Sequence, residues 1–260
     1  MNILFVADVV GRPGREALED RLAGLRAELN IGVCIVNGEN IADGVGITPK
    51  LADRLLAAGA DVITLGNHTW RRQEITSYLA ASDRVIRPAN LSADAPGRGI
   101  TVVTATDGSS VGVVNVMGSL SLEPARSMWE IVDDLVEEAR ATTPVILVDV
   151  HAEATSEKVA LARWLDGRVT AVIGTHTHVQ TSDARVQPGG TAAITDAGMT
   201  GPHDSVIGVK AELATQRMRT GMPVRFEVAA DGVRIEGALV ECDVASGRAT
   251  AIRPVRVPWP

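Results

Sequence analysis

Short apolar runs alternate with stretches of helical periodicity along most of the chain. Residues 3–7 form an apolar run without a polar side chain, which is typical of a strand buried on both faces of a sheet. Residues 12–29 then place apolar side chains three or four positions apart, as in an amphipathic helix. Further buried strands are predicted at 33–36, 62–65, 145–148 and 169–173. The alternation predicts repeated strand–helix units.

Capping residues define the other predicted helices. Thr48 suits the first position of a helix that extends to residue 58, with Pro49 in its first turn. Gly59 is suited to end this helix. Further helices are predicted at 73–81, 125–141 and 156–165.

Antiparallel strands are predicted in the middle and at the end of the chain. Residues 99–106 and 111–117 flank the turn Asp107-Gly108-Ser109 and predict a β-hairpin. Residues 206–218 fit a helix or, in part, a strand. Other strands are predicted at 84–86 as an edge strand, and at 191–194, 223–228, 233–240 and 249–257. We expect one α/β domain over residues 1–260, with helices outside two packed sheets.

Composition excludes some classes of function. The hydrophobic fraction of 45% is ample for a core, and the net charge is −7 without a long run of either sign. An extended nucleic-acid surface or an anionic-membrane surface is therefore not expected, whereas a small phosphate-bearing ligand needs only local positive charge. The strands near the C-terminus could supply an edge for a homo-oligomer.

The two cysteines and the first residues bear on location. Cys34 and Cys242 lie far apart and lack CxxC spacing, which indicates buried thiols in a reducing compartment. No apolar span approaches the roughly 20 residues that cross a bilayer, and Asp8 interrupts the first apolar run too early for a signal peptide. A cytoplasmic location is expected.

Polar side chains follow five of the predicted strands. The ends of parallel strands gather ligands in open α/β sheets, so we expect these side chains to lie close together. In an extended chain, His176 and His178 would point to the same side. The residues are Asp8; Glu39 and Asn40; Asn67 and His68; His151; and His176 and His178.

The ligand types indicate two metal ions. Each residue alone is more often structural, but carboxylates, amide oxygens and imidazoles at five strand ends exceed the needs of one tetrahedral zinc. The mixed set suits two ions of manganese, iron or zinc. One carboxylate normally bridges two such ions, and Glu39 is the candidate for that bridge.

The order of these motifs resembles the calcineurin-like metallophosphoesterases. That family shows Asp, a bridging acid, Gly-Asn-His, His and Gly-His-x-His in this order. Here Asp8-Val9-Val10 lacks the usual first-strand histidine, and Glu39 stands where an aspartate is usual. Both departures resemble the YmdB-like branch, as do the segments Asn37-Gly38-Glu39-Asn40, Gly66-Asn67-His68-Thr69-Trp70 and 195–202.

The resemblance extends from Asp8 to about Gly208 and carries several implications. It implies a four-layer α/β/β/α sandwich, a di-iron or di-manganese centre, and phosphodiesterase action on cyclic nucleotides, with 2',3'-cyclic nucleotides as the expected substrates. His68 would be the proton donor to the leaving group, after in-line attack by a hydroxide that bridges the ions. The resemblance assigns Asp8, Glu39 and His178 to one metal, with Asn40 replacing the missing histidine, and Glu39, Asn67, His151 and His176 to the other.

Weaker candidates surround this set. Thr175 and Thr177 could orient ligands, and Asp196 could act from the loop near the cleft, although β-branched residues also simply suit strands. Arg71 and Arg72 could meet a phosphate or lie at a solvated helix start. His203 is expected to be a surface loop residue.

Alternative functions stay open. A phosphomonoesterase or nucleotidase of broad specificity would use the same metals. A regulatory nucleotide-sensing or RNA-associated protein could contain the metals with little turnover. An amidohydrolase barrel is less favoured, because its His-x-His pair is expected on the first strand.

Overall fold

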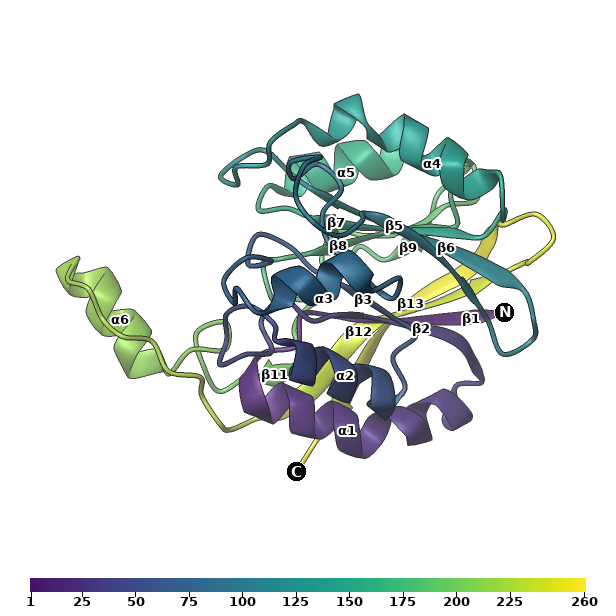
Figure 1. Ribbon diagram of the computed structural model, residues 1–260. Helices are drawn as coiled ribbons and strands as arrows, with labels where there is room; N and C mark the ends of the chain where they lie inside the picture. The colour runs from purple at the N-terminus through teal and green to yellow at the C-terminus, as the bar shows by residue number, and fades with distance from the viewer.

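Two β-sheets stack face to face and helices cover their outer faces in the computed structural model, which describes residues 1–260 (Figure 1). The four layers confirm the α/β/β/α arrangement expected from the sequence. The first sheet has the order β11 (Gly201–Pro202), β12 (Val233–Cys242), β1 (Asn2–Val6), β2 (Ile31–Asn37), β3 (Val62–Thr64) and β4 (Val85–Ile86), with β13 (Ala249–Pro258) also paired to β12. The second has the order β5 (Ile100–Thr104), β6 (Ser110–Met117), β7 (Ile146–His151), β8 (Ala171–Thr175), β10 (Ala192–Ile194) and β9 (Arg185–Val186).

Helices lie on both outer sides of the stacked sheets. In Figure 1, α4 and α5 cover the second sheet at the top, and α1 and α2 cover the first sheet at the bottom. Their bounds, with those of the remaining helices, are α1 (Gly11–Glu28), α2 (Pro49–Ala58), α3 (Ile75–Ala81), η1 (Met128–Glu130), α4 (Val132–Arg140), α5 (Thr155–Trp164) and α6 (Ala211–Thr220). None of them combines the length and the apolar composition needed to cross a bilayer.

The run of apolar residues in β1 follows from the layered core. Leu4 and Val6 pack in the cluster under α1 and α2, whereas Ile3 and Phe5 pack in the cluster between the two sheets. Successive side chains of a strand point to opposite faces, so both sets are buried. Burying each such side chain contributes roughly 1.5–3 kcal/mol relative to exposure.

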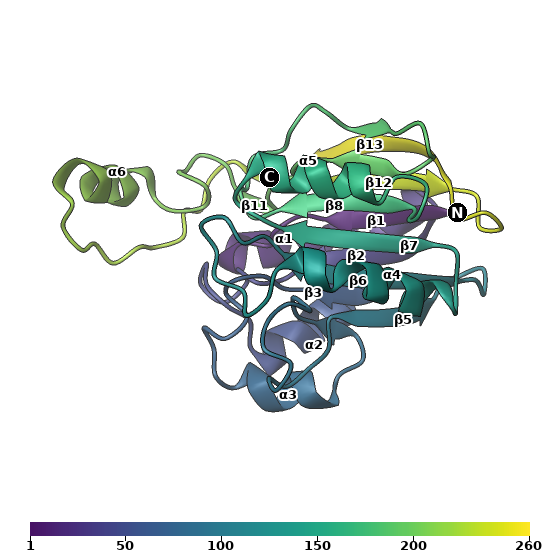
Figure 2. The same ribbon diagram turned by 90° about the horizontal axis from the view of Figure 1, so that it is seen from above.

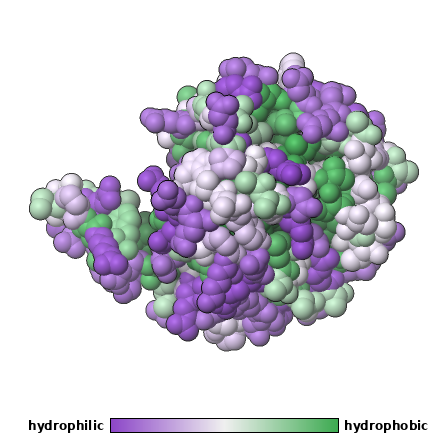
Figure 3. Space-filling view, in the orientation of Figure 1, coloured by the Kyte–Doolittle hydropathy of each residue, from purple (hydrophilic) through white to green (hydrophobic).

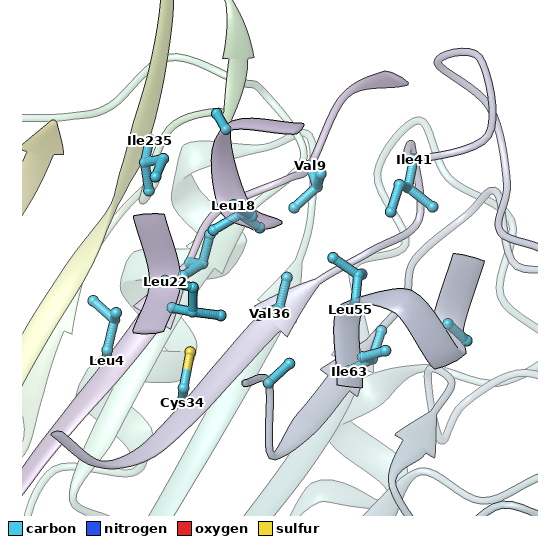
Figure 4. Close-up of a cluster of buried hydrophobic side chains, with 14 of the residues drawn as sticks. Leu4, Val9, Leu18, Leu22, Cys34, Val36, Ile41, Leu55, Ile63 and Ile235 are labelled. Carbon is cyan, nitrogen blue, oxygen red and sulfur yellow. The ribbon is translucent and has the colours of Figure 1, made fainter. Parts of the chain in front are cut away.

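Figure 4 shows the cluster between the first sheet and its helices. Leu18 and Leu22 of α1 lie over β1 and β2, and Leu55 of α2 lies over the next strand. The predicted start of α2 is confirmed, because the Thr48 hydroxyl accepts a hydrogen bond from the Leu51 N–H at 3.4 Å. Its predicted end is confirmed too, because Gly59 caps the helix with φ 118°.

The direction of the central strands positions the site. Strands β1, β2 and β3 are mutually parallel in the first sheet, and β6, β7 and β8 are parallel in the second. The carboxyl ends of each parallel set therefore share one edge of their sheet.

Two predicted elements differ in the structure. The expected helix 125–141 is divided into η1 and the shorter α4. The expected strand 223–228 does not form, and only Val228 makes an isolated bridge, to Val209. Residues 206–218, which fitted either type, contribute to helix α6.

Helix α6 stands away from the sandwich. Figures 1 and 2 both show it projecting from the layered body, joined by two extended connections. In Figure 3 this projection carries hydrophobic as well as hydrophilic surface. Met218, Met222 and Phe226 belong to this segment and are exposed.

Candidate metal centre

The polar strand ends meet where the two sheets face each other. Asp8, Glu39 and Asn67 follow β1, β2 and β3 of the first sheet, and His151 ends β7 of the second. His176 directly follows β8. Glu39 Oε1 lies 3.1 Å from His151 Nε2, so ligands from both sheets are in contact.

Four side chains converge on one point. The His151 Nε2 atom lies 2.9 Å from Asn67 Oδ1 and 3.0 Å from His176 Nδ1, in addition to Glu39 Oε1. Glu39, His151 and His176 offer ligand atoms that all lie within 4.8 Å of one another. Nitrogen and oxygen ligands bound to one ion at about 2.0–2.2 Å are themselves roughly 3 Å apart, so this spacing fits a metal ion.

Asp8, Asn40 and His178 form a second group beside the first. Asp8 Oδ1 is buried without a hydrogen-bond partner and lies 3.8 Å from His178 Nε2. Asn40 Nδ2 lies 3.0 Å from the same His178 nitrogen. A buried carboxylate oxygen without a partner is costly, and a cation at this position would satisfy it.

In His176 and His178, the ring nitrogen that points away from the centre is bonded to an acceptor and therefore carries the proton. His178 Nδ1 donates to the carbonyl oxygen of Ile207 at 3.0 Å. His176 Nε2 lies 3.0 Å from Glu153 Oε2, which can only accept. In each ring the other nitrogen, which faces the centre, is then left with its lone pair, as a metal ligand requires.

The third histidine is oriented by a buried relay. The Thr175 hydroxyl donates to Asp149 Oδ1 at 2.7 Å, so it accepts from His151 Nδ1 at 2.9 Å. This leaves His151 Nε2 to face the ligand atoms of the centre. Burial raises the pKa of Asp149 to about 6. The predicted orienting role of Thr175 therefore agrees with its contacts.

Charges at the centre favour one positive charge beside Glu39. Burial opposes ionisation of Glu39, but the charge and hydrogen bond of His151 outweigh it and lower the pKa to about 2. Burial likewise opposes protonation of His151, but Glu39, Asp8 and Asp149 raise its pKa to about 9. Burial and the charge of His151 lower the pKa of His176 to about 3. The site thus attracts a cation, either a proton or a metal ion.

The turn after β8 differs from the predicted extended chain. The φ angles of His176 and His178 are 97° and 64°, so their side chains do not alternate as in a strand. Asp196 fixes this turn by accepting from the Thr177 N–H at 3.1 Å and from the Thr177 hydroxyl at 2.7 Å. Asp196 is in turn paired with Lys158 at 2.8 Å, and both side chains are buried. The two histidines therefore reach the centre through a constrained left-handed turn.

His68 lies at the edge of the centre. Its N–H donates to Glu39 Oε2 at 3.0 Å, and its Nδ1 donates to Asn40 Oδ1 at 2.7 Å. No protein group is hydrogen-bonded to its Nε2. Burial lowers the pKa of the ring, which is a quarter exposed.

Other candidates have structural contacts. Arg72 donates to the carbonyls of Ala42 and Val45, and Arg71 is exposed. His203 lies in a loop, as expected, but its side chain is only 14% exposed and its Nε2 lies 3.1 Å from the carbonyl oxygen of Met199.

Asp149 and Lys158 support residues of the candidate centre, and the sequence did not single them out. Asp149 had a signal, since it is a charged residue beside an apolar run that predicts a fully buried strand. Lys158 had none, because its partner Asp196 is distant along the chain.

Comparisons with known proteins match almost the whole chain. The model of the YmdB-like protein family matches residues 4–255. The chain is 44% identical over 257 residues to a 2',3'-cyclic-nucleotide 2'-phosphodiesterase of Bacillus subtilis. The alignment covers 99% of this chain and 97% of that protein.

Solved structures give the same result. A crystal structure of a novel phosphatase from Mycoplasma pneumoniae has a TM-score of 0.91 and 32% identity, over 99% of this chain and 93% of that one. The calcineurin-like phosphoesterase YfkN of Bacillus subtilis shares the fold alone, with a TM-score of 0.62 and 12% identity, over 99% of this chain and 90% of that one. These matches confirm the phosphoesterase fold and the expected class of enzyme, a hydrolase of phosphate esters. The chain belongs to the YmdB-like protein family.

Proposed function

We propose that this protein is a dinuclear metal-dependent phosphodiesterase that hydrolyses 2',3'-cyclic nucleotides. The observation that carries this proposal is the orientation of three imidazoles, each with an inward lone pair, beside the buried carboxylates of Asp8 and Glu39. The name of the Bacillus subtilis relative supports the choice of substrate.

The two groups of ligands suggest two metal positions. Glu39, Asn67, His151 and His176 would hold one ion, and Asp8, Glu39, Asn40 and His178 the other. We propose iron or manganese, with zinc as a further candidate, since all three accept mixed nitrogen and oxygen ligands. Such ions, when bound, would neutralise phosphate charge and lower the pKa of water so that hydroxide can attack phosphorus.

The chain itself orients these ligands and moves a proton. Asp149, acting through Thr175, keeps the outer nitrogen of His151 protonated. In its imidazolium form His68 would donate a proton from Nε2 to the departing ribose oxygen, because its Nδ1–H is held by Asn40 and no protein group is hydrogen-bonded to Nε2. Its half-buried position keeps the ring beside Glu39 while leaving it accessible to substrate.

Metal content and hydrolysis test the proposal together. We expect about two metal ions per chain by elemental analysis, and turnover of 2',3'-cyclic AMP that a chelator abolishes and added metal restores. Replacing His68 with Asn should lower kcat by roughly 10²–10⁴-fold while the metal content is retained. One metal or none after reconstitution would contradict the dinuclear centre.

A second activity is favoured by a relative's name. The Mycoplasma pneumoniae protein is described as a phosphatase, so a phosphomonoester should be assayed in parallel. A higher kcat/KM for the monoester would replace our proposal with a monoesterase at the same metals. Two bound metals without turnover of either ester would favour a nucleotide-sensing role.

A further inference from the structure

A cavity of about 360 Å³ opens directly beside the candidate metal centre. His178 forms part of its wall, so the cavity and the centre share a side chain. The far wall contains Arg234, Glu236 and Arg256, which lie on the paired strands β12 and β13. The volume is within the range of small-molecule sites, which begins at roughly 300 Å³.

The polar wall of the cavity is held in a defined geometry. Glu236 is 1% exposed, and Arg256 Nε donates to its Oε1 at 2.9 Å. Gln180 directs its amide N–H groups at the carbonyl oxygens of Ala197, Gly237 and Val255, at 3.0–3.1 Å. The amide oxygen of Gln180 is therefore free to accept from Arg256 Nη2 at 3.3 Å. The guanidinium of Arg256 is thus oriented before any ligand arrives.

The wall carries more positive charge than is needed to neutralise Glu236. One guanidinium is sufficient to balance the buried carboxylate of Glu236, yet Arg234 Nε also lies 2.9 Å from the same oxygen. This contact is not aligned as a hydrogen bond, and the buried Arg234 Nε has no hydrogen-bond partner. Two arginines against one glutamate leave a net charge of +1. An anion in the cavity would meet a guanidinium whose donors are not all used.

The remaining wall combines two polar residues, His203 and Ser205, with apolar side chains. Val179 and Ile207 are 61% and 53% exposed, and Met199, which also lines the cavity, is buried. Apolar side chains in a cavity that also contains an arginine pair and borders the candidate metal centre suit the sugar or base of a nucleotide.

We propose that this cavity binds a second phosphate of the substrate, the phosphate on the 5' oxygen of a nucleoside whose 2',3'-cyclic phosphate lies at the metal centre. The inference rests on the proposed function and narrows its substrate class. Arg234 and Arg256 would bind the 5'-phosphate, because planar guanidinium groups match phosphate oxygens in geometry and charge. Two sources share this chemistry: a free 5'-phosphorylated cyclic nucleotide and the 3' end of an RNA strand.

Equilibrium binding tests the subsite without turnover. Calorimetry on the metal-loaded protein would compare adenosine 3'-monophosphate with adenosine 3',5'-bisphosphate. We expect the bisphosphate to bind at least about tenfold more tightly, a gain typical of one or two charge-assisted hydrogen bonds. Arg234→Met and Arg256→Met should each remove most of this difference. Each single variant leaves Glu236 paired with the other arginine, and thermal denaturation would verify folding.

Arg253→Met is the matched control. Arg253 is an exposed arginine of β13 that does not line the cavity, so its loss removes the same charge from the same strand. The control should keep the preference for the bisphosphate. Equal affinity of the unchanged protein for both ligands would overturn the proposal, as would a preference that survives both cavity variants or is lost equally in the control.

Hydrolysis then distinguishes the two sources. The substrates would be 2',3'-cyclic AMP, the same compound with a 5'-phosphate, and a diadenosine that ends in a 2',3'-cyclic phosphate. A gain in kcat/KM for both phosphorylated substrates supports the subsite, and a larger gain for the dinucleotide identifies RNA ends as the source. Hydrolysis of all three at one rate overturns the subsite alone. Hydrolysis of none overturns the proposed function, whereas the calorimetric comparison still decides the subsite.

Discussion

At the residue scale, the buried pair of Lys158 and Asp196 holds the turn that carries two candidate metal ligands. The side chains are 2% and 1% exposed, and their charged atoms lie 2.8 Å apart. Asp196 also accepts two hydrogen bonds from Thr177, between His176 and His178. A buried charge without its partner is strongly destabilising, so each member of the pair depends on the other.

Replacing Lys158 with Met should therefore destabilise the fold. We expect the free energy of unfolding, measured by urea denaturation, to fall by about 3–5 kcal/mol because the carboxylate of Asp196 would remain buried and unpaired. The control is Lys210→Met, which removes an exposed ion pair with Glu227 and should change stability little. Similar small losses in both variants would contradict a structural role for the buried pair.

Tyr78 gives a residue-scale prediction about pH, since it is the single tyrosine of the chain. Its hydroxyl donates to Asp53 at 2.6 Å, and partial burial with this hydrogen bond raises its pKa from 10.0 to about 12. The unfolded chain loses the phenolic proton first as pH rises. The stabilisation is therefore full below pH 10 and is lost between pH 10 and about 12.

Phenolate absorbance during alkaline titration measures this pKa directly. The folded protein should titrate near pH 12 and the denatured protein near pH 10. Asp53→Asn should bring the folded midpoint down towards the ordinary value, because the negative charge is removed. A folded midpoint near 10 in the unchanged protein would show that the hydrogen bond does not persist in solution.

At the scale of elements, apolar periodicity predicted most strands because their side chains report burial on one or both faces. Residues 223–228 show where this signal fails. Val224, Phe226 and Val228 alternate with Arg225 and Glu227, which is the pattern of a half-buried strand. Only Val228 forms a β-bridge, so the alternation does not become a strand. A strand forms only where a neighbouring segment offers backbone hydrogen bonds, and the local pattern of apolar residues does not show whether such a neighbour exists.

Gly66, two residues after β3, must be small so that the candidate ligands Glu39 and His151 can approach each other. A Cβ on Gly66 would overlap the His151 ring and the Glu39 carboxylate. Gly66→Ala should therefore weaken metal binding by at least roughly 10–100-fold, as displacement of ligand-orienting groups commonly does. Competition with a fluorescent chelator would measure the change in affinity.

Gly24→Ala is the control for this substitution. Gly24 lies inside α1, and its added Cβ would approach only Glu28, at 3.8 Å. Alanine in a helix should leave metal affinity unchanged and increase stability by about 0.5–1 kcal/mol. Unchanged metal affinity in Gly66→Ala would place the metal elsewhere.

At the scale of the whole molecule, the centre exists only when both sheets are packed together. Asp8 and Glu39 come from the first sheet and His151 from the second, and the cluster between the sheets includes Phe5 and Ile35. Separation of the sheets would therefore break the candidate metal centre and the core at once.

Cys34, which packs between the first sheet and its helices, reports on cooperative unfolding of the whole molecule. It is fully buried in β2, and burial raises the pKa of its thiol to about 12. Alkylation by iodoacetamide should therefore require unfolding and be slowed by the unfolding equilibrium constant, roughly 10³-fold or more relative to the denatured chain. Mass spectrometry of the labelled peptide gives the rate. Fast labelling in native buffer would mean that β2 opens locally.

The sequence by itself determined the layered α/β fold and the ligand types at the strand ends. Apolar runs, caps and motif order are local signals, and each reports on burial or chemistry within a few positions. The tertiary structure decided which atoms meet. The left-handed turn of His176 and His178, the pairing of Lys158 with Asp196 and the cavity beside Arg234 all join distant segments. Such contacts depend on how the two sheets pack, which no short stretch of sequence specifies.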